Sequence, residues 1–240
     1  MLMAEKQTTT KSESENGMQN EYENEAFQTA PELAYRIISQ KILDGEYHPG
    51  MKLSRRKMAE VTGMSVIPVI EALKKLEEDG LVESKPKWGS FVTIPTEEKV
   101  EESFEARQAI ECQVARIMSR RMTDEQRAVL WTIAEDLDTI PYYEETVEES
   151  RERHFRFHRT LAEYTGNSFL ISGLDRINLF WNLSNALIGR ASKEKYPRYW
   201  HRKLMDDICS GDEDLAEKSM RIHVLDSKDA VIENVRRQQY

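Results

Sequence analysis

Four of the five histidines lie at spacings that suit metal binding, namely His154, His158, His201 and His223. His154 and His158 are four residues apart in a segment with helical periodicity, so both rings would project from one helix face. His201 and His223 fall in two later helical segments. Because imidazole is the commonest metal ligand in proteins, these residues predict a site for a divalent transition metal, zinc or nickel first. The alternative is that the histidines only fill a polar patch.

A bundle of helices has to position these imidazoles. From residue 97 onward the chain has helical periodicity with only short breaks. The spacing predicts six helices, at 97–121, 124–138, 142–165, 168–191, 197–210 and 213–236. Helices of this length joined by short connections form antiparallel bundles. We therefore predict that residues 96–240 form one all-helical domain.

Residues 28–95 have a different pattern, in which three helices are followed by two short strands around a turn. Ser54 and Ser65 are placed to cap the second and third helices. The strands are expected at 81–83 and 91–93. Helix, short helix, turn, helix and hairpin make a winged helix-turn-helix, which is a DNA-binding fold. The predicted fold class is thus mainly α, with a small β-hairpin wing beside the helical bundle.

The composition is that of an ordinary globular protein, with 39% hydrophobic and 32% charged residues among 240. No apolar run approaches the roughly 18 residues that span a bilayer, and the N-terminus has no signal-peptide core, so no membrane partner is expected. Cys112 and Cys209 are too few for a disulfide framework, which indicates reduced thiols and a cytoplasmic protein. Residues 1–27 are polar and are predicted to be a disordered tail.

Charge is spread unevenly along the chain. The net charge of −9 argues against a protein that coats nucleic acid. Residues 31–95, however, hold ten Lys and Arg against nine Asp and Glu. Because salt screens distant acids beyond roughly 8–10 Å, clustered cations in this segment can still contact phosphates.

The first of these segments, PGMKLSRRKMAEVTGMSVIPVIEALKKLEEDGLVESKPKWGSFV, resembles the GntR family of bacterial regulators. The helical remainder is similar to the FCD effector domain of the FadR-like branch. The shared positions in that domain are Arg107, Glu111, Phe157-His158, Gly166-Asn167, His201, Gly211-Asp212 and His223. The resemblance implies a homodimer that binds a palindromic DNA operator and responds when a small metabolite, often a carboxylate, enters the bundle.

The resemblance also implies a set of ligands in the bundle. FCD proteins usually place an Asp four residues before a His, and here His154 stands at the Asp position. The other ligand positions match as His158, His201 and His223. Residues expected to bind the effector, a small organic acid, are Arg107, Trp181 and Asn185. For Arg107 the alternative is a surface ion pair with Glu111, and for Trp181 it is a simple core position.

The DNA-reading helix departs from the family pattern. The two positions that commonly hold arginine are Val66 and Ile70 here. Arginine reads guanine, whereas aliphatic side chains pack against thymine methyl groups, so A·T steps are expected in the operator. The expected DNA-contacting residues are Arg55, Arg56, Lys57, Ser65, Val66, Ile67, Ile70, Lys74, Lys87 and Gly89. The alternative is that exposed Val66 and Ile70 mark a lost operator function or a protein-binding surface.

The combined prediction is a metabolite-responsive transcriptional regulator. A zinc enzyme is the alternative from another class, but four imidazoles fill a tetrahedral site and no HExxH motif is present. We therefore expect no catalytic activity. An effector-binding dimer that no longer recognises specific DNA is the remaining alternative.

Overall fold

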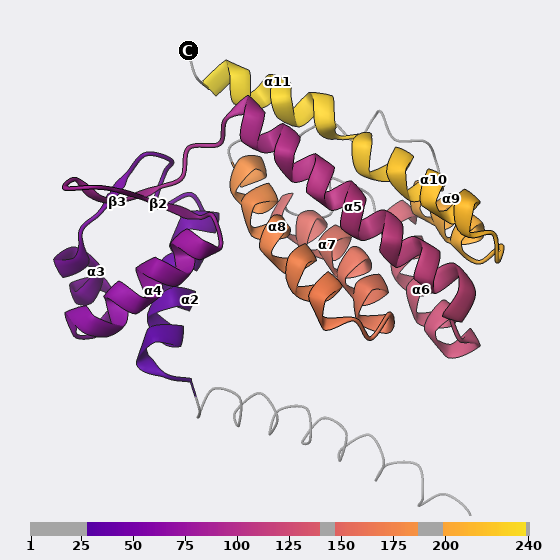
Figure 1. Cartoon of the computed structure of the whole chain (residues 1–240), viewed down its shortest axis with the longest axis horizontal. Helices are drawn as coiled ribbons and strands as arrows, with labels where there is room; N and C mark the ends of the chain where they lie inside the picture. Colours follow the sequence, from indigo (N-terminus) through magenta and orange to yellow (C-terminus); the bar gives the residue numbers. More distant parts are fainter. Residues whose placement is uncertain (1–27, 140–146, 187–198, 239–240) are drawn as a thin grey trace, which may run out of the picture.

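The computed structural model describes residues 28–139, 147–186 and 199–238. They form a winged-helix lobe and a helical bundle (Figure 1). The elements of the first lobe are α2 (Ala30–Leu43), β1 (Lys52–Leu53), α3 (Arg55–Thr62), α4 (Val66–Glu78), β2 (Val82–Lys85) and β3 (Gly89–Val92). The predicted fold class is confirmed. The predicted tail, residues 1–27, lies outside the described residues.

The helices of this lobe begin where the sequence supplies caps. Thr29 and Glu32 form a reciprocal capping box at the start of α2, which contains Pro31 in its first turn. Ser54 and Ser65 occupy the N-cap positions of α3 and α4 as predicted, but neither side chain makes a capping hydrogen bond. The positions of these two serines were therefore correct, and the expected capping interaction was wrong.

The sheet has one strand more than the predicted hairpin. In the described residues the strand order is β1-β3-β2 and both pairings are antiparallel, with Lys52 opposite Phe91 and Leu53 opposite Ser90. A strand of two residues is too short for alternation of side chains to be visible in the sequence. The wing itself is formed by β2 and β3, with Lys85 opposite Gly89 beside the turn.

The bundle surrounds one long central helix, α5. Figure 1 shows α5 between α10 and α11 on one side and α7 and α8 on the other. The helices are α5 (Glu97–Arg121), α6 (Asp124–Thr139), α7 (Val147–Tyr164), α8 (Ser168–Ala186), α9 (Trp200–Ile208), α10 (Glu213–Leu225) and α11 (Lys228–Gln238). The expected ends of the helices at 142–165, 168–191 and 197–210 fall partly outside the described residues.

The single helix predicted over 213–236 is wrong, because the chain breaks after Leu225. Asp226 is the C-cap of α10, and the carbonyl of Ser227 accepts a hydrogen bond from the amide of Val231 as α11 begins. Asp and Ser side chains compete with the backbone for hydrogen bonds and favour such interruptions. The apolar spacing continues across the break, so periodicity alone did not reveal it.

Two apolar clusters hold the described residues together. One fills the bundle, and the other fills the winged helix between α2, α3, α4 and the sheet. Leu183, only 1% exposed, and Leu179 of α8 pack into the second cluster. Helix α8 therefore belongs to the bundle and also contacts the DNA-binding lobe. Within the described residues no helix combines the length and apolarity that crossing a membrane requires.

Candidate functional site

Four imidazoles from three parts of the bundle converge at one place. The Nε2 atoms of His154 and His158 on α7 are 3.0 Å apart, and those of His158 and His223 on α10 are 3.2 Å apart. His154 and His223 are separated by 3.3 Å between the same atoms. His201, at the start of α9, offers a nitrogen within 4.8 Å of those of His154 and His223. The structure thus brings together all four predicted ligands.

The spacing of these nitrogens suits a transition-metal ion. With metal–nitrogen bonds of about 2.0–2.1 Å, neighbouring ligand nitrogens lie about 3.0 Å apart in octahedral and about 3.4 Å apart in tetrahedral coordination. The separations among His154, His158 and His223, from 3.0 to 3.3 Å, fall within that range. The donor set, with neutral imidazoles and no thiolate among the four, also matches zinc, nickel, cobalt or iron.

Burial keeps two of the rings neutral. It lowers the pKa of His154 and of His223 well below the ordinary value of 6.5, and the neighbouring imidazoles lower both further. A neutral imidazole offers the lone pair that a metal requires, whereas an imidazolium does not. His154 and His223 are therefore in the ligating form at pH 7.

The carboxylate of Glu111 orients His158. Glu111 on α5 accepts a hydrogen bond from Nε of Arg107 at 2.8 Å and forms a shorter ion pair with Nδ1 of His158. All three side chains are at most 5% exposed. Burial alone would raise the pKa of Glu111, but the charge of Arg107 and the His158 ring outweigh it and lower that pKa to about 2. An ionised Glu111 at Nδ1 leaves Nε2 of His158 facing the other imidazoles.

Asp138 at the end of α6 has the same role for His201. Its carboxylate contacts Nδ1 of His201 at 2.9 Å and accepts the backbone amides of His201 at 3.1 Å and Arg202 at 3.0 Å. Those amides are at the start of α9, where Tyr199 is in the left-handed conformation and provides no side-chain cap. One carboxylate therefore caps a helix and orients an imidazole.

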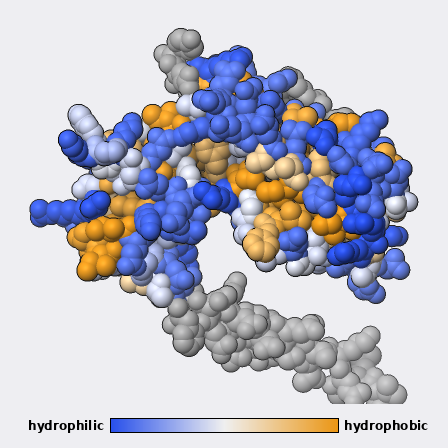
Figure 2. All heavy atoms as spheres, viewed as in Figure 1, coloured by the Kyte–Doolittle hydropathy of each residue, from blue (hydrophilic) through white to orange (hydrophobic). Residues whose placement is uncertain are grey.

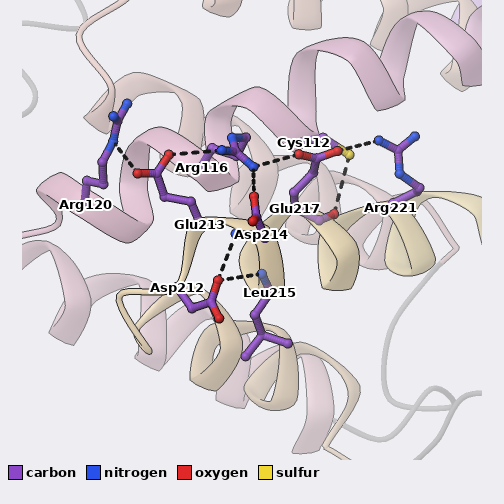
Figure 3. A network of polar contacts seen from close by, with 9 residues as sticks. All are labelled: Cys112, Arg116, Arg120, Asp212, Glu213, Asp214, Leu215, Glu217 and Arg221. Atoms are coloured by element: carbon purple, nitrogen blue, oxygen red, sulfur yellow. Dashed lines mark hydrogen bonds and ion pairs between the residues drawn. The ribbon is translucent and has the colours of Figure 1, made fainter.

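His223 is held by the packing of α10. Its ring stacks on Trp200, with centroids 5.6 Å apart and 26° between the planes. On the outer side, Arg116 of α5 contacts Asp214 at 2.5 Å, Glu217 at 2.9 Å and Glu213 at 3.4 Å (Figure 3). These contacts join the first turns of α10, the helix that carries His223, to α5.

Two of the three predicted effector residues adjoin the histidine cluster. The guanidinium of Arg107 lies 5.4 Å from the ring of Trp181, which in turn lies 6.3 Å from the ring of His154. The ion pair of Arg107 with Glu111, weighed as a surface contact, is present but buried. Asn178, one turn before Trp181 on α8, is 4% exposed. Asn185 lies in α8, but its side chain is outside the described residues.

The predicted DNA-contacting cations lie on the surface of the winged helix. Arg55, Arg56 and Lys57 form the first turn of α3 and are exposed. Arg56 is 91% exposed and pairs weakly with Glu60 at 3.5 Å. Lys74 is 77% exposed near the end of α4. No contact within the described part of the chain buries any of these four cations.

The remaining predicted contacts lie on α4 and at the tip of the wing. Ser65, Val66, Ile67 and Ile70 are exposed at the N-terminal half of α4. In the wing, Lys87 has φ 67° and Gly89 has φ 101°. A Cβ on Gly89 would lie 3.6 Å from the Lys52 side chain, so it is the backbone angle that favours glycine there.

With this geometry established, comparison with known proteins decides the family. A family model described as "Bacterial regulatory proteins, gntR family" matches residues 32–92, and one described as "FCD domain" matches residues 102–226. The chain belongs to the GntR family. This GntR regulator therefore combines a DNA-binding winged helix with an FCD effector-binding domain.

Individual relatives are similar to it over most of its length or over the DNA-binding part. The HTH-type transcriptional regulator YdhC of Bacillus subtilis is 22% identical over 191 residues, which are 79% of this chain and 85% of that protein. The transcriptional repressor RspR of Escherichia coli is 37% identical over 92 residues, 38% of this chain and 40% of that protein. The E. coli McbR/YncC structure matches with a TM-score of 0.68 at 16% identity, covering 89% of this chain and 100% of that one. YdhC and RspR are transcriptional regulators and the gntR model describes bacterial regulatory proteins, so this GntR protein is a transcriptional regulator and not an enzyme.

Three supporting residues were not predicted as part of the site. Asp138 and Trp200 were not singled out, and Glu111 was noted as a position shared with the FCD domain and as a partner of Arg107, without a role at the histidines. Asp138 and His201 are 63 positions apart in the sequence, so no local pattern indicates that they are in contact. The i, i+4 spacing of Arg107 and Glu111 was visible, but their burial and the link to His158 depend on how α5 and α7 pack.

Proposed function

We propose that this GntR regulator senses a small organic acid at a metal-bearing site in its FCD domain. Binding of the acid would change how a homodimer engages a palindromic operator in the cytoplasm. The observation that carries the proposal is the convergence of His154, His158 and His223 with Nε2 separations of 3.0–3.3 Å. Such crowding of lone pairs is unfavourable unless protons or a cation occupy the space between them.

His154, His158, His201 and His223 would hold the metal. Zinc and nickel are the first candidates because both accept imidazole readily. Glu111 and Asp138 would keep two of the rings oriented, as carboxylates behind metal-bound histidines do. The bound ion would supply a positive centre for an anionic ligand.

Charge favours a carboxylate as the effector. Four neutral imidazoles place no negative charge on a divalent ion, in contrast to a site with an Asp ligand, so only the carboxylates behind His158 and His201 offset its charge. Arg107 adds a second cation beside the cluster, and its pairing with Glu111 uses Nε. A guanidinium grips carboxylates through parallel hydrogen bonds. We infer that the effector lies between the metal and Arg107, next to Trp181.

The response requires two states with different effector affinities. Helix α8 is suited to connect the histidine cluster with the DNA-binding lobe, because Trp181 is beside the cluster and Leu183 packs into the winged-helix core. An effector that moves α8 would therefore move the DNA-binding lobe. In a homodimer this would change the spacing of the two α4 helices along the operator.

Metal titration of the full chain tests the sensor. We expect isothermal titration with zinc, and separately with nickel, to give one site per chain in the wild type. His158→Ala combined with His201→Ala should abolish it, whereas His48→Ala should not, because His48 is exposed and lies in the winged helix. His154→Asp should still bind metal, with a weaker preference for anionic ligands. Equal binding by wild type and the double variant would refute the metal site.

Arg107→Lys tests the effector site independently. In metal-loaded protein we expect a panel of mono- and dicarboxylates to raise the melting temperature of the wild type by several degrees and of the variant by much less. The point charge of lysine keeps attraction but loses the two-point grip. Stabilisation of both proteins to the same extent would place the carboxylate elsewhere.

A further inference from the structure

The exposed side of α4 is apolar at its N-terminal half. Val66 is 42% exposed, Ile67 is 70% exposed and Ile70 is 38% exposed. Val66 and Ile70 are one turn apart and Ile67 is beside them, so the three side chains form a continuous patch. The opposite side of α4 already supplies the core with Val69 and Leu73. Packing of this lobe therefore does not account for the patch.

Exposed cations lie on the same lobe as the patch, together with the exposed acids Glu60 and Glu71. Figure 2 shows hydrophobic surface beside hydrophilic surface on the winged-helix lobe. Arg56, 91% exposed, and its neighbours Arg55 and Lys57 stand at the start of α3, and Lys74, 77% exposed, lies farther along α4. An apolar patch among cations fits a polyanion that also offers apolar groups. Duplex DNA has that combination, because its major groove holds the C5-methyl groups of thymine between two rows of phosphates.

Valine and isoleucine side chains carry no hydrogen-bond donor or acceptor. They cannot read the N7, O6, N6 or O4 edges of the bases. The one feature of the major groove that they can recognise is the thymine methyl group. We propose that Val66, Ile67 and Ile70 select operator half-sites by the 5-methyl groups of thymine, while the surrounding cations contact phosphates. This proposal rests on DNA binding through α4.

Replacing thymine by uracil measures the contribution of the methyl group alone, because uracil lacks the C5-methyl group and keeps every hydrogen-bonding atom. The full-length protein is first used to select a duplex from a random-sequence library. Each thymine of a half-site is then replaced by uracil, and Kd is measured by fluorescence anisotropy at one fixed salt concentration. We expect binding to weaken about fourfold for each contacted methyl, the value of one buried methyl-sized group.

Matched variants assign the effect to the patch. The triple variant Val66→Ser, Ile67→Ser and Ile70→Ser should bind the thymine and uracil duplexes equally, and circular dichroism should show an unchanged fold because all three side chains are exposed. Arg56→Gln should weaken both duplexes by the same factor, as loss of a phosphate contact does. Ile222→Ser, an exposed apolar position on α10, should keep the full discrimination.

Three outcomes would overturn the proposal, and they are distinguishable. If the wild type binds thymine and uracil duplexes with equal affinity, DNA binding stands and methyl recognition is wrong. If no duplex is selected at any salt concentration, specific DNA binding itself fails, and the proposal fails with it. Discrimination that persists in the triple variant of Val66, Ile67 and Ile70 would also overturn it.

Discussion

Asp138 connects the position of His201 to the start of α9, because one carboxylate contacts Nδ1 at 2.9 Å and two amides at 3.0 and 3.1 Å. Burial alone would raise the pKa of Asp138, but the His201 ring and the two backbone amides outweigh it and lower the pKa below 3.8. The carboxylate is therefore ionised at pH 7. Helix formation and ligand orientation at this corner of the bundle depend on the same side chain.

Asp138→Asn is expected to weaken zinc binding by about 10–100-fold, the usual effect of removing a carboxylate behind a metal-bound imidazole. Competition with a zinc chelator measures the change. Glu135→Gln, on the same helix, is the control, because Glu135 is 53% exposed and pairs with Arg202 at 3.5 Å. Equal affinities of Asp138→Asn and wild type would show that Asp138 only caps α9.

Glu111→Gln removes the charge that balances buried Arg107. We expect the free energy of unfolding at pH 7 to fall by about 3 kcal/mol, because breaking a buried ion pair leaves an uncompensated charge. The pKa of Glu111 is about 2 in the folded chain against an ordinary 4.5. Its contribution is therefore complete above pH 4.5 and is lost as the pH falls toward 2.

Urea unfolding of metal-free protein at several pH values checks this expectation. The difference between wild type and Glu111→Gln should be largest at neutral pH and should shrink below pH 4.5. Glu217→Gln is a suitable comparison, since Glu217 is 31% exposed in its ion pairs and should cost much less. A difference that stays constant with pH would mean that the carboxylate charge is not what stabilises the bundle.

Apolar spacing and capping residues predicted the helices well wherever both occur within the helix itself. The buried residues of α4, for example, are Val69, Ala72, Leu73 and Leu76, which recur at helical spacing after the N-cap residue Ser65. The break at Asp226 and Ser227 was missed because apolar spacing continues through it. Strand β1 was missed because a strand of two residues is too short to show alternating apolar and polar side chains. Both features depend on hydrogen bonds that spacing does not encode.

The cluster of four histidines was predictable from the sequence, but the residues that orient its rings were not. Four histidines stand out by type and spacing, and the structure brings them together. Asp138 is one of 43 acidic residues, and nothing local marks it as the partner of His201. The contact arises because α6 packs against α9, which is a property of the tertiary structure. Residues that orient ligands are in general found only when the helices are placed.

Cys112 is expected to be unreactive in the folded protein. Its side chain is 4% exposed, and burial raises the pKa of the thiol to about 11. Since the thiolate is the reactive form, alkylation by iodoacetamide at pH 8 should be far slower than for a free thiol. Mass spectrometry of tryptic peptides, with and without urea, measures this for each cysteine. Rapid labelling of Cys112 in native protein would show that α5 and α10 separate in solution.

Trp88 should report DNA binding by the wing. It is 70% exposed beside Lys87, whereas Trp131, Trp181 and Trp200 are half-buried in the bundle. Iodide should therefore quench one component of the tryptophan fluorescence strongly, since the lysines attract the anion. Trp88→Phe should remove that component, and the selected duplex should protect it in the wild type. Quenching that is unchanged at saturating DNA would mean that the wing tip stays in solvent, and the phosphate contacts would then come from α3 and α4 alone.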